Sequence, residues 1–124
     1  MAQPSEAAFP TDKLSALRLG RPLVAEVEAG RPEYRAWIEI RPLRTDADAA
    51  AQREGWTRND EGRSFRLTHC EYVIERLDGW DYDIGSDEIK RTTAADEADL
   101  LALLQDWGVP PERFTYPWDT DFPA

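Results

Sequence analysis

The chain contains one cysteine, one histidine and no long hydrophobic run. Cys70 has no second cysteine to pair with, which excludes an internal disulfide scaffold. A structural zinc site usually needs four Cys or His ligands, more than Cys70 and His69 provide. No apolar run approaches the ~20 residues of a membrane helix, and no charged-then-apolar leader opens the chain. We therefore expect no membrane association and a cytoplasmic location.

Catalytic motifs are also missing from the sequence. There is no G-x-G-x-x-G or Walker sequence to cradle phosphate and no G-x-S-x-G nucleophile elbow. His69 and Cys70 are neighbours, and neighbouring residues on a strand point to opposite faces, so they cannot act together as base and nucleophile. We therefore expect a protein that is not an enzyme and that uses no cofactor.

Basic residues are few relative to acidic ones. The chain has 15 Lys+Arg against 25 Asp+Glu, a formal net charge of -10 and a pI near 4.5. Residues 63–124 carry fourteen of the acidic residues and only six of the basic ones. Direct binding to nucleic-acid phosphates is therefore not expected, because that binding depends on clustered Lys and Arg.

Length and composition favour one globular domain. With 124 residues, 41% of them hydrophobic, the chain can bury roughly 65% of its unfolded surface. The pattern of segments predicts an α+β fold with an antiparallel sheet of about four to five strands, built from hairpins and packed by two or three helices. We expect a loose arm over 1–10, the α+β core over 11–108, and an aromatic, proline-containing tail over 109–124.

The first half of the core predicts a short helix and a hairpin. Thr11 or Asp12 is expected to cap the helix, and Gly20 to end it. Strands over 23–28 and 34–41 flank a five-residue loop. In the second strand the even positions should meet the core, namely Tyr34, Ala36, Ile38 and Ile40. The odd positions should meet water, namely Arg35, Trp37, Glu39 and Arg41.

The second half predicts two helices and a second hairpin. An alanine-rich helix is expected over 45–54, with Trp56 packed against its end, and strand character resumes at 64–67. Residues 70–77 fit either a helix or a strand. Asp78-Gly79 favours the strand, in a hairpin that pairs Val73 with Ile84. The last helix is expected to be capped by Thr93, to be ended by Gly108 with Pro110, and to bury a leucine stripe.

Two segments have alternative interpretations. Carboxylates at alternate positions from Asp81 resemble the start of an EF-hand calcium loop, but Gly85 occupies the third ligand position and Thr92 the place of the bidentate Glu. A calcium or magnesium site, or an enzyme that uses the acids of 81–88, therefore remains the alternative.

The aromatic tail either wraps the domain or packs on a partner, which includes a second copy of the chain.

Acidic residues alternate with aromatic residues in the second half, a pattern typical of a surface that docks on a basic protein. The charges steer the encounter and the aromatic side chains supply affinity. The sequence therefore predicts a small acidic binding protein that acts stoichiometrically on a basic macromolecule, as an inhibitor or immunity protein neutralises a toxin or nuclease. A purely structural interaction subunit is a further alternative. The residues expected to contact the partner are Trp80, Asp81, Tyr82, Asp83, Asp87 and Glu88, followed by Trp118, Asp119 and Asp121.

Overall fold

The computed structural model describes residues 8–73 and 86–120, and its centre is a four-stranded antiparallel sheet with the order β1-β2-β3-β4. The strands are β1 (Leu23–Val27), β2 (Tyr34–Pro42), β3 (Phe65–Val73) and β4 (Ser86–Ala94). The described helices are α1 (Thr11–Arg18), α2 (Asp46–Arg53) and α4 (Glu97–Trp107), and two short 3₁₀ turns, η1 (Pro111–Arg113) and η2 (Pro117–Asp119), follow. The predicted α+β fold is confirmed.

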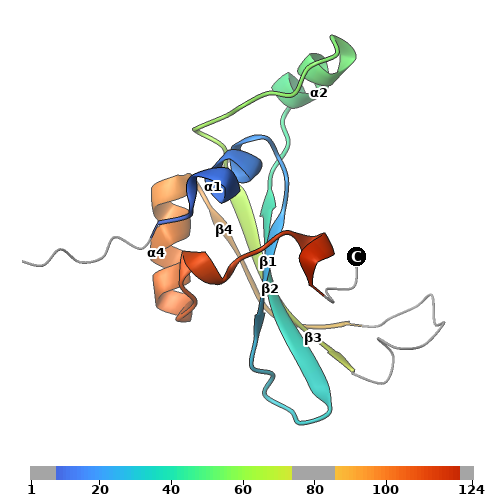
Figure 1. Cartoon of the computed structure of the whole chain (residues 1–124), viewed down its shortest axis with the longest axis vertical. Helices are drawn as coiled ribbons and strands as arrows, with labels where there is room; N and C mark the ends of the chain where they lie inside the picture. The colour runs from blue at the N-terminus through green and yellow to red at the C-terminus, as the bar shows by residue number, and fades with distance from the viewer. Residues whose placement is uncertain (1–7, 74–85, 121–124) are drawn as a thin grey trace, which may run out of the picture.

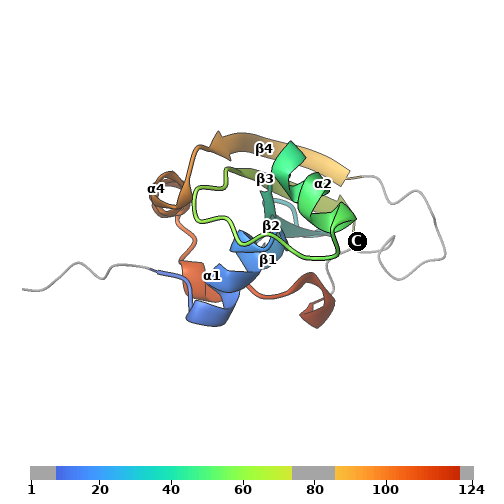
Figure 2. The same cartoon turned by 90° about the horizontal axis from the view of Figure 1, so that it is seen from above.

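One face of the sheet carries the hydrophobic core. Figure 1 shows α1 and α4 on the same side of the sheet, while α2 stands at one end of the molecule. The helices contribute Leu17, Leu100 and Leu104, which pack against sheet residues that include Ile40 and Leu67. Viewed from above, the strands lie in sequence order, with the C-terminal segment beyond β1 (Figure 2). Burial of these apolar side chains is the main source of stability.

Local hydrogen bonds explain where the helices begin and end. Thr45 and Asp48 form a capping box at the start of α2, as the acidic start of the predicted helix indicates. Gly108 ends α4 with φ 74°, a left-handed conformation that glycine adopts without strain. The predicted cap at Thr93 is wrong, because β4 continues to Ala94 and the side chain of Asp96 accepts the hydrogen bond of the Asp99 N–H.

Two other local predictions are also wrong. Pro10, which has no side-chain hydrogen bond to offer, occupies the position before α1, so neither Thr11 nor Asp12 caps this helix. Trp56 is 53% exposed and donates its indole N–H to Glu54 at 3.2 Å, so it does not pack against the end of α2. The positive φ of Gly55 ends α2, and the backbone N–H of Trp56 donates back to the Ala51 carbonyl at 3.0 Å.

The hairpin predictions hold where the structure describes them. β1 pairs with β2, and Leu23 lies opposite Ile40. Residues 70–73 belong to β3, so the strand interpretation is confirmed for these four residues. β4 is antiparallel to β3, with Tyr72 opposite Ser86. The Asp78-Gly79 turn and the predicted partner of Val73, Ile84, lie outside the described residues.

The second face of the sheet is not simply solvated, and here the sequence prediction is wrong. Trp37 was expected to face water, but its side chain is completely buried. Its ring meets that of Tyr72 edge-on at 5.7 Å, and its indole N–H donates to the Thr120 hydroxyl at 3.4 Å. The reason is tertiary: the C-terminal tail, distant in sequence, contacts this face at Trp37, whereas Arg41 on the same face is exposed as predicted.

Candidate functional site

The C-terminal tail wraps around the β1 edge of the sheet. Phe114 is buried in the core against Phe9, at a ring distance of 6.1 Å. The next residue, Thr115, pairs with Val24 of β1 through two backbone hydrogen bonds of 2.8 and 2.9 Å. Tyr116 is also partly buried against the core, and Thr120 contacts Trp37, so the wrapped interpretation is correct for the described part of the tail apart from the side chains it leaves in solvent. The wrapping fixes the position at which Trp118 enters solvent.

Trp118 is exposed although the tail that carries it is anchored. It is 70% exposed, and its ring stacks parallel to that of Tyr116 at 4.9 Å between centroids. The ammonium of Lys13 lies 4.7 Å from the Tyr116 centroid. Lys13, Tyr116 and Trp118 thus form a cation–ring–ring assembly that holds the indole outward on a rigid base.

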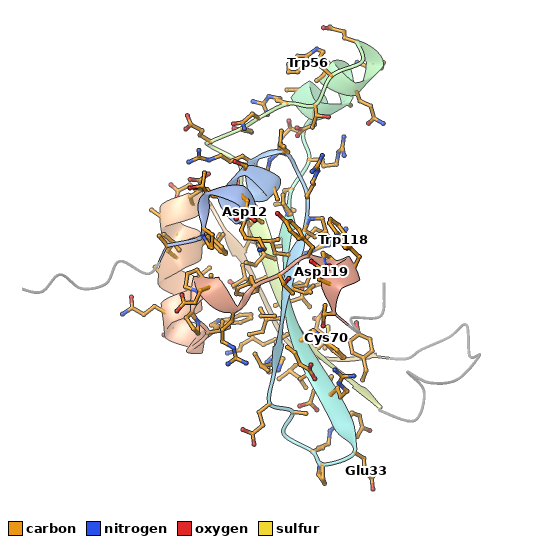
Figure 3. All side chains as sticks on the ribbon, viewed as in Figure 1. Asp12, Glu33, Trp56, Cys70, Trp118 and Asp119 are labelled. Carbon is orange, nitrogen blue, oxygen red and sulfur yellow. The ribbon has the colours of Figure 1, made fainter. Side chains whose placement is uncertain are left out.

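Carboxylates lie beside this assembly. Asp12 is exposed and accepts a 3.3 Å hydrogen bond from the Tyr116 hydroxyl. Desolvation opposes its ionisation, but the neighbouring Lys13 and the hydrogen bonds outweigh this and hold the pKa of Asp12 below its usual value. Asp119 is exposed directly after Trp118 (Figure 3). We call the group Asp12, Lys13, Tyr116, Trp118 and Asp119 the Trp118 patch.

The structure places the other predicted contact residues elsewhere or does not describe them. Trp80, Asp81, Tyr82, Asp83 and Asp121 lie outside the described residues. Asp87 and Glu88 belong to β4, the strand at the opposite edge of the sheet from β1. Glu88 is also ion-paired with Arg91 at 2.6 Å. Among the predicted residues that the structure describes, Trp118 and Asp119 therefore lie together in the tail, apart from Asp87 and Glu88.

A second concave feature lies on the core face, beside the C-terminal end of α4. This cavity has a volume of about 320 Å³, and strands β1 to β4, α4 and the start of the tail all contribute to its wall. We call it the His69 cavity. Its lining residues are Val27, Glu28, Ile38, His69, Lys90, Trp107, Gly108, Val109 and Arg113.

His69 is partly buried on β3, between β2 and β4. Its Nε2 atom is buried and has no hydrogen-bond partner. Desolvation lowers the pKa of His69, and Lys90 across the strand pair adds to this, although Glu71 opposes it. Burial therefore favours the neutral imidazole, and its Nε2 has no hydrogen-bond partner among residues 8–73 and 86–120.

Nothing local in the sequence reveals the His69 cavity. Its cations, Lys90 and Arg113, and its aromatic wall, Trp107, come from three separate segments that meet only in the fold. His69 was considered in the sequence for nucleophilic or metal chemistry only. The alternation of core and solvent positions along β3 places His69 on the core face, and this alternation is a local signal for the orientation of His69 but not for the cavity.

Two buried carboxylates are structural. Asp48 pairs with Arg63, whose side chain has no exposed surface. Glu71 accepts hydrogen bonds from the Gly30 N–H at 2.8 Å and from Arg31 at 3.0 Å, which fixes the β1–β2 loop. Both pairs satisfy their charges internally and leave no reactive group.

Neither a metal-ligand cluster in the described residues nor a comparison with known proteins assigns a function to the chain. Within residues 8–73 and 86–120, no three His, Cys, Asp or Glu residues are grouped to hold a metal ion. The acids at 81 and 83 lie outside this part of the chain. None of the described helices combines the length and hydrophobicity needed to cross a membrane. The chain matches no protein-family model, and comparisons with curated proteins and with solved structures found no match.

Proposed function

We propose that this protein is a small acidic binding protein without catalytic activity, which docks stoichiometrically on a basic protein through the Trp118 patch. The observation that carries the proposal is the 70% exposure of Trp118 on an anchored tail. A tryptophan held rigidly in solvent loses little conformational entropy when a partner covers it, and tryptophan is enriched among residues that dominate binding energy.

Charge supports a basic rather than an acidic partner. The net charge of -10 attracts a cationic protein over the whole approach. At the contact itself, the outer face of the Trp118 ring suits an arginine or lysine side chain, and Asp119 beside it offers a carboxylate. An inhibitor of a basic toxin or nuclease is the kind of protein in which such a surface acts. A second copy of the chain carries the same charge and fits less well.

The proposal is tested with Trp118→Ala and a matched control. Trp56→Ala removes another exposed tryptophan, which Figure 3 shows at the far end of the molecule. Immobilised wild-type protein and both variants are incubated with lysate of the source organism. We expect wild type and Trp56→Ala to retain one basic protein at 1:1 stoichiometry, and Trp118→Ala to bind the purified partner about 30-fold more weakly.

Salt gives an independent criterion. Raising the ionic strength from about 0.1 M to about 1 M shortens the Debye length from about 10 Å to about 3 Å, which should slow association. Retention of an acidic protein, equal retention by Trp118→Ala, or an association rate indifferent to salt would each contradict the proposal. A shift of the protein alone from dimer to monomer on Trp118→Ala would identify the patch as a self-association surface in its place.

A further inference from the structure

The His69 cavity has the size and composition of a ligand site. Its volume of about 320 Å³ falls within the range of small-molecule pockets, roughly 300–1,000 Å³. Val27, Ile38 and Val109 supply apolar wall, and Trp107 supplies an aromatic side. The polar groups that line it come from different elements and converge on one space, which is the arrangement that fixes the orientation of a small ligand.

Two cations line this cavity without an ion pair to any residue that the structure describes. The ammonium of Lys90 lies 4.3 Å from the Trp107 centroid and forms no ion pair in the described structure. Arg113 donates to the Glu26 backbone carbonyl at 3.0 Å and likewise has no carboxylate within 4 Å among the described residues. Arginines elsewhere, such as Arg18 and Arg35, contact carboxylates at 2.8 and 2.7 Å. Lys90 and Arg113 are both exposed, so an anion that enters the cavity can reach them.

The buried Nε2 of His69 is the second observation. A buried nitrogen without a partner costs free energy, and because Nε2 has no exposed surface, a ligand in the cavity satisfies it when the imidazole ring turns toward the cavity. His69 and Lys90 lie opposite each other in the β3–β4 pair, so one ligand head group can reach both side chains. Neutral imidazole can donate from Nε2 to a carboxylate oxygen when the other nitrogen is unprotonated.

We propose that the His69 cavity binds a small organic monocarboxylate. Lys90 and Arg113 hold the carboxylate, His69 hydrogen-bonds to it, and a short apolar body lies against Trp107 and Ile38. Glu28 is the one acidic lining residue, and its charge disfavours a polyanion such as a nucleotide. This site is separate from the Trp118 patch, so it adds a ligand to the proposed docking function and does not depend on it.

The test uses benzoate, its neutral analogue benzamide, and inorganic phosphate as probes. Because the chain has a single histidine, its imidazole NMR signals report on His69 without assignment. We expect benzoate to shift these signals saturably, benzamide to bind at least about tenfold more weakly, and phosphate to cause no saturable shift. Loss of one charge-assisted hydrogen bond of about 1.5–3 kcal/mol corresponds to roughly 10- to 150-fold in affinity.

Three variants locate the site. Lys90→Gln and Arg113→Gln should each weaken benzoate binding about tenfold or more. Arg66→Gln is the matched control, because Arg66 pairs with Thr93 and does not line the cavity. Lys90 contacts Trp107 in the last turn of α4, so Lys90→Gln can also lower the stability of the fold, and a thermal melt without ligand measures that loss separately. Arg113 is exposed, so Arg113→Gln should leave the core intact.

Each outcome decides the matter. Benzoate binding that both cavity variants weaken and that Arg66→Gln and Trp118→Ala leave unchanged supports the proposal. Equal affinity for benzoate and benzamide, no saturable shift at about 10 mM of any probe, saturation by phosphate alone, or equal weakening by Arg66→Gln would overturn it. Because Trp118→Ala tests docking and Arg113→Gln tests the cavity, failure of one proposal is distinguishable from failure of the other.

Discussion

Replacing Asp48 by Asn tests the most deeply buried ion pair among the described residues. Both oxygens of Asp48 accept from the Arg63 guanidinium, at 2.8 and 2.9 Å, and the Arg63 side chain has no exposed surface. The same guanidinium donates to the backbone carbonyls of Arg18 and Leu43, at 2.9 and 3.0 Å. One pair therefore joins the end of α1, the end of β2 and the start of α2.

The expected loss is large because the guanidinium stays buried. Asp48→Asn removes the negative charge and turns an acceptor into an amide donor that faces other donors. Breaking a buried pair in this way costs about 3–5 kcal/mol, a substantial part of the ~5–15 kcal/mol that stabilises a typical domain. For a chain of this size the Tm should fall by about 10 °C or more in a calorimetric melt at pH 7.

Asp46→Asn is the matched control. Asp46 belongs to the same first turn of α2 but is exposed, so the same chemical change should cost less than about 1 kcal/mol, mainly through the helix dipole. If the free energies of unfolding of Asp48→Asn and Asp46→Asn differed by less than about 1 kcal/mol, the conclusion that the buried pair stabilises the contact of these three elements would be refuted.

The pH dependence supplies a second criterion. Hydrogen bonds from Arg63, and to a lesser extent those from Thr45, lower the pKa of Asp48 well below the ordinary range of an aspartate in spite of desolvation. A depressed pKa in the folded state contributes stability above the unfolded pKa, and that contribution is lost as the pH falls. The difference in Tm between wild type and Asp48→Asn should therefore be constant from about pH 5 to 8 and shrink below about pH 4. A constant difference down to pH 2.5 would contradict this cause.

Two further predictions concern stability. Glu71→Gln should cost about 1–3 kcal/mol in urea unfolding, because Gly30 and Arg31 lose a buried acceptor. Glu33→Gln, in the same loop region but exposed, should change the unfolding free energy little. The hydrogen bond from Gly30 and the pairing with Arg31 lower the pKa of Glu71, so the difference should diminish as the pH falls below the ordinary Glu range, and a difference that grows in acid would contradict it. Gly108→Ala should destabilise the protein by about 1 kcal/mol, because φ is 74° at this position. Gly62→Ala is the control and should cost less, because φ is not positive at Gly62. Equal Tm values for the two variants would show that the left-handed cap of α4 does not matter for stability.

Much of the fold could be predicted because its signals are local. Alternating core residues in β2, the glycine after α4 and the alanine-rich α2 with its acidic start each indicate an element through contacts a few residues apart. The predicted caps at Thr11 or Asp12 and at Thr93 failed for a related reason. Several polar residues near each helix start could cap it, and strand pairing or a proline decided which one lies at the first turn.

The candidate site could be predicted only in part. The tail sequence indicated that Trp118 and Asp119 belong together, and the structure adds that Tyr116 and Lys13 support the exposed ring. Asp87 and Glu88 looked equally suitable in sequence, yet sheet order places them at the other edge and Arg91 neutralises Glu88. Charge counts along a chain do not reveal which arginine each carboxylate meets.

By itself, the sequence determined the acidic charge, the α+β class, the β1–β2 hairpin and the helices α2 and α4, because composition and short-range hydrogen bonding suffice for these. Only the tertiary structure decided that Trp37 is buried while Trp118 is exposed, and that Lys90, Trp107 and Arg113 meet around His69. The physical reason is that burial depends on which distant segment covers a surface. Here the tail crosses β1 and covers one tryptophan as it carries the other into solvent.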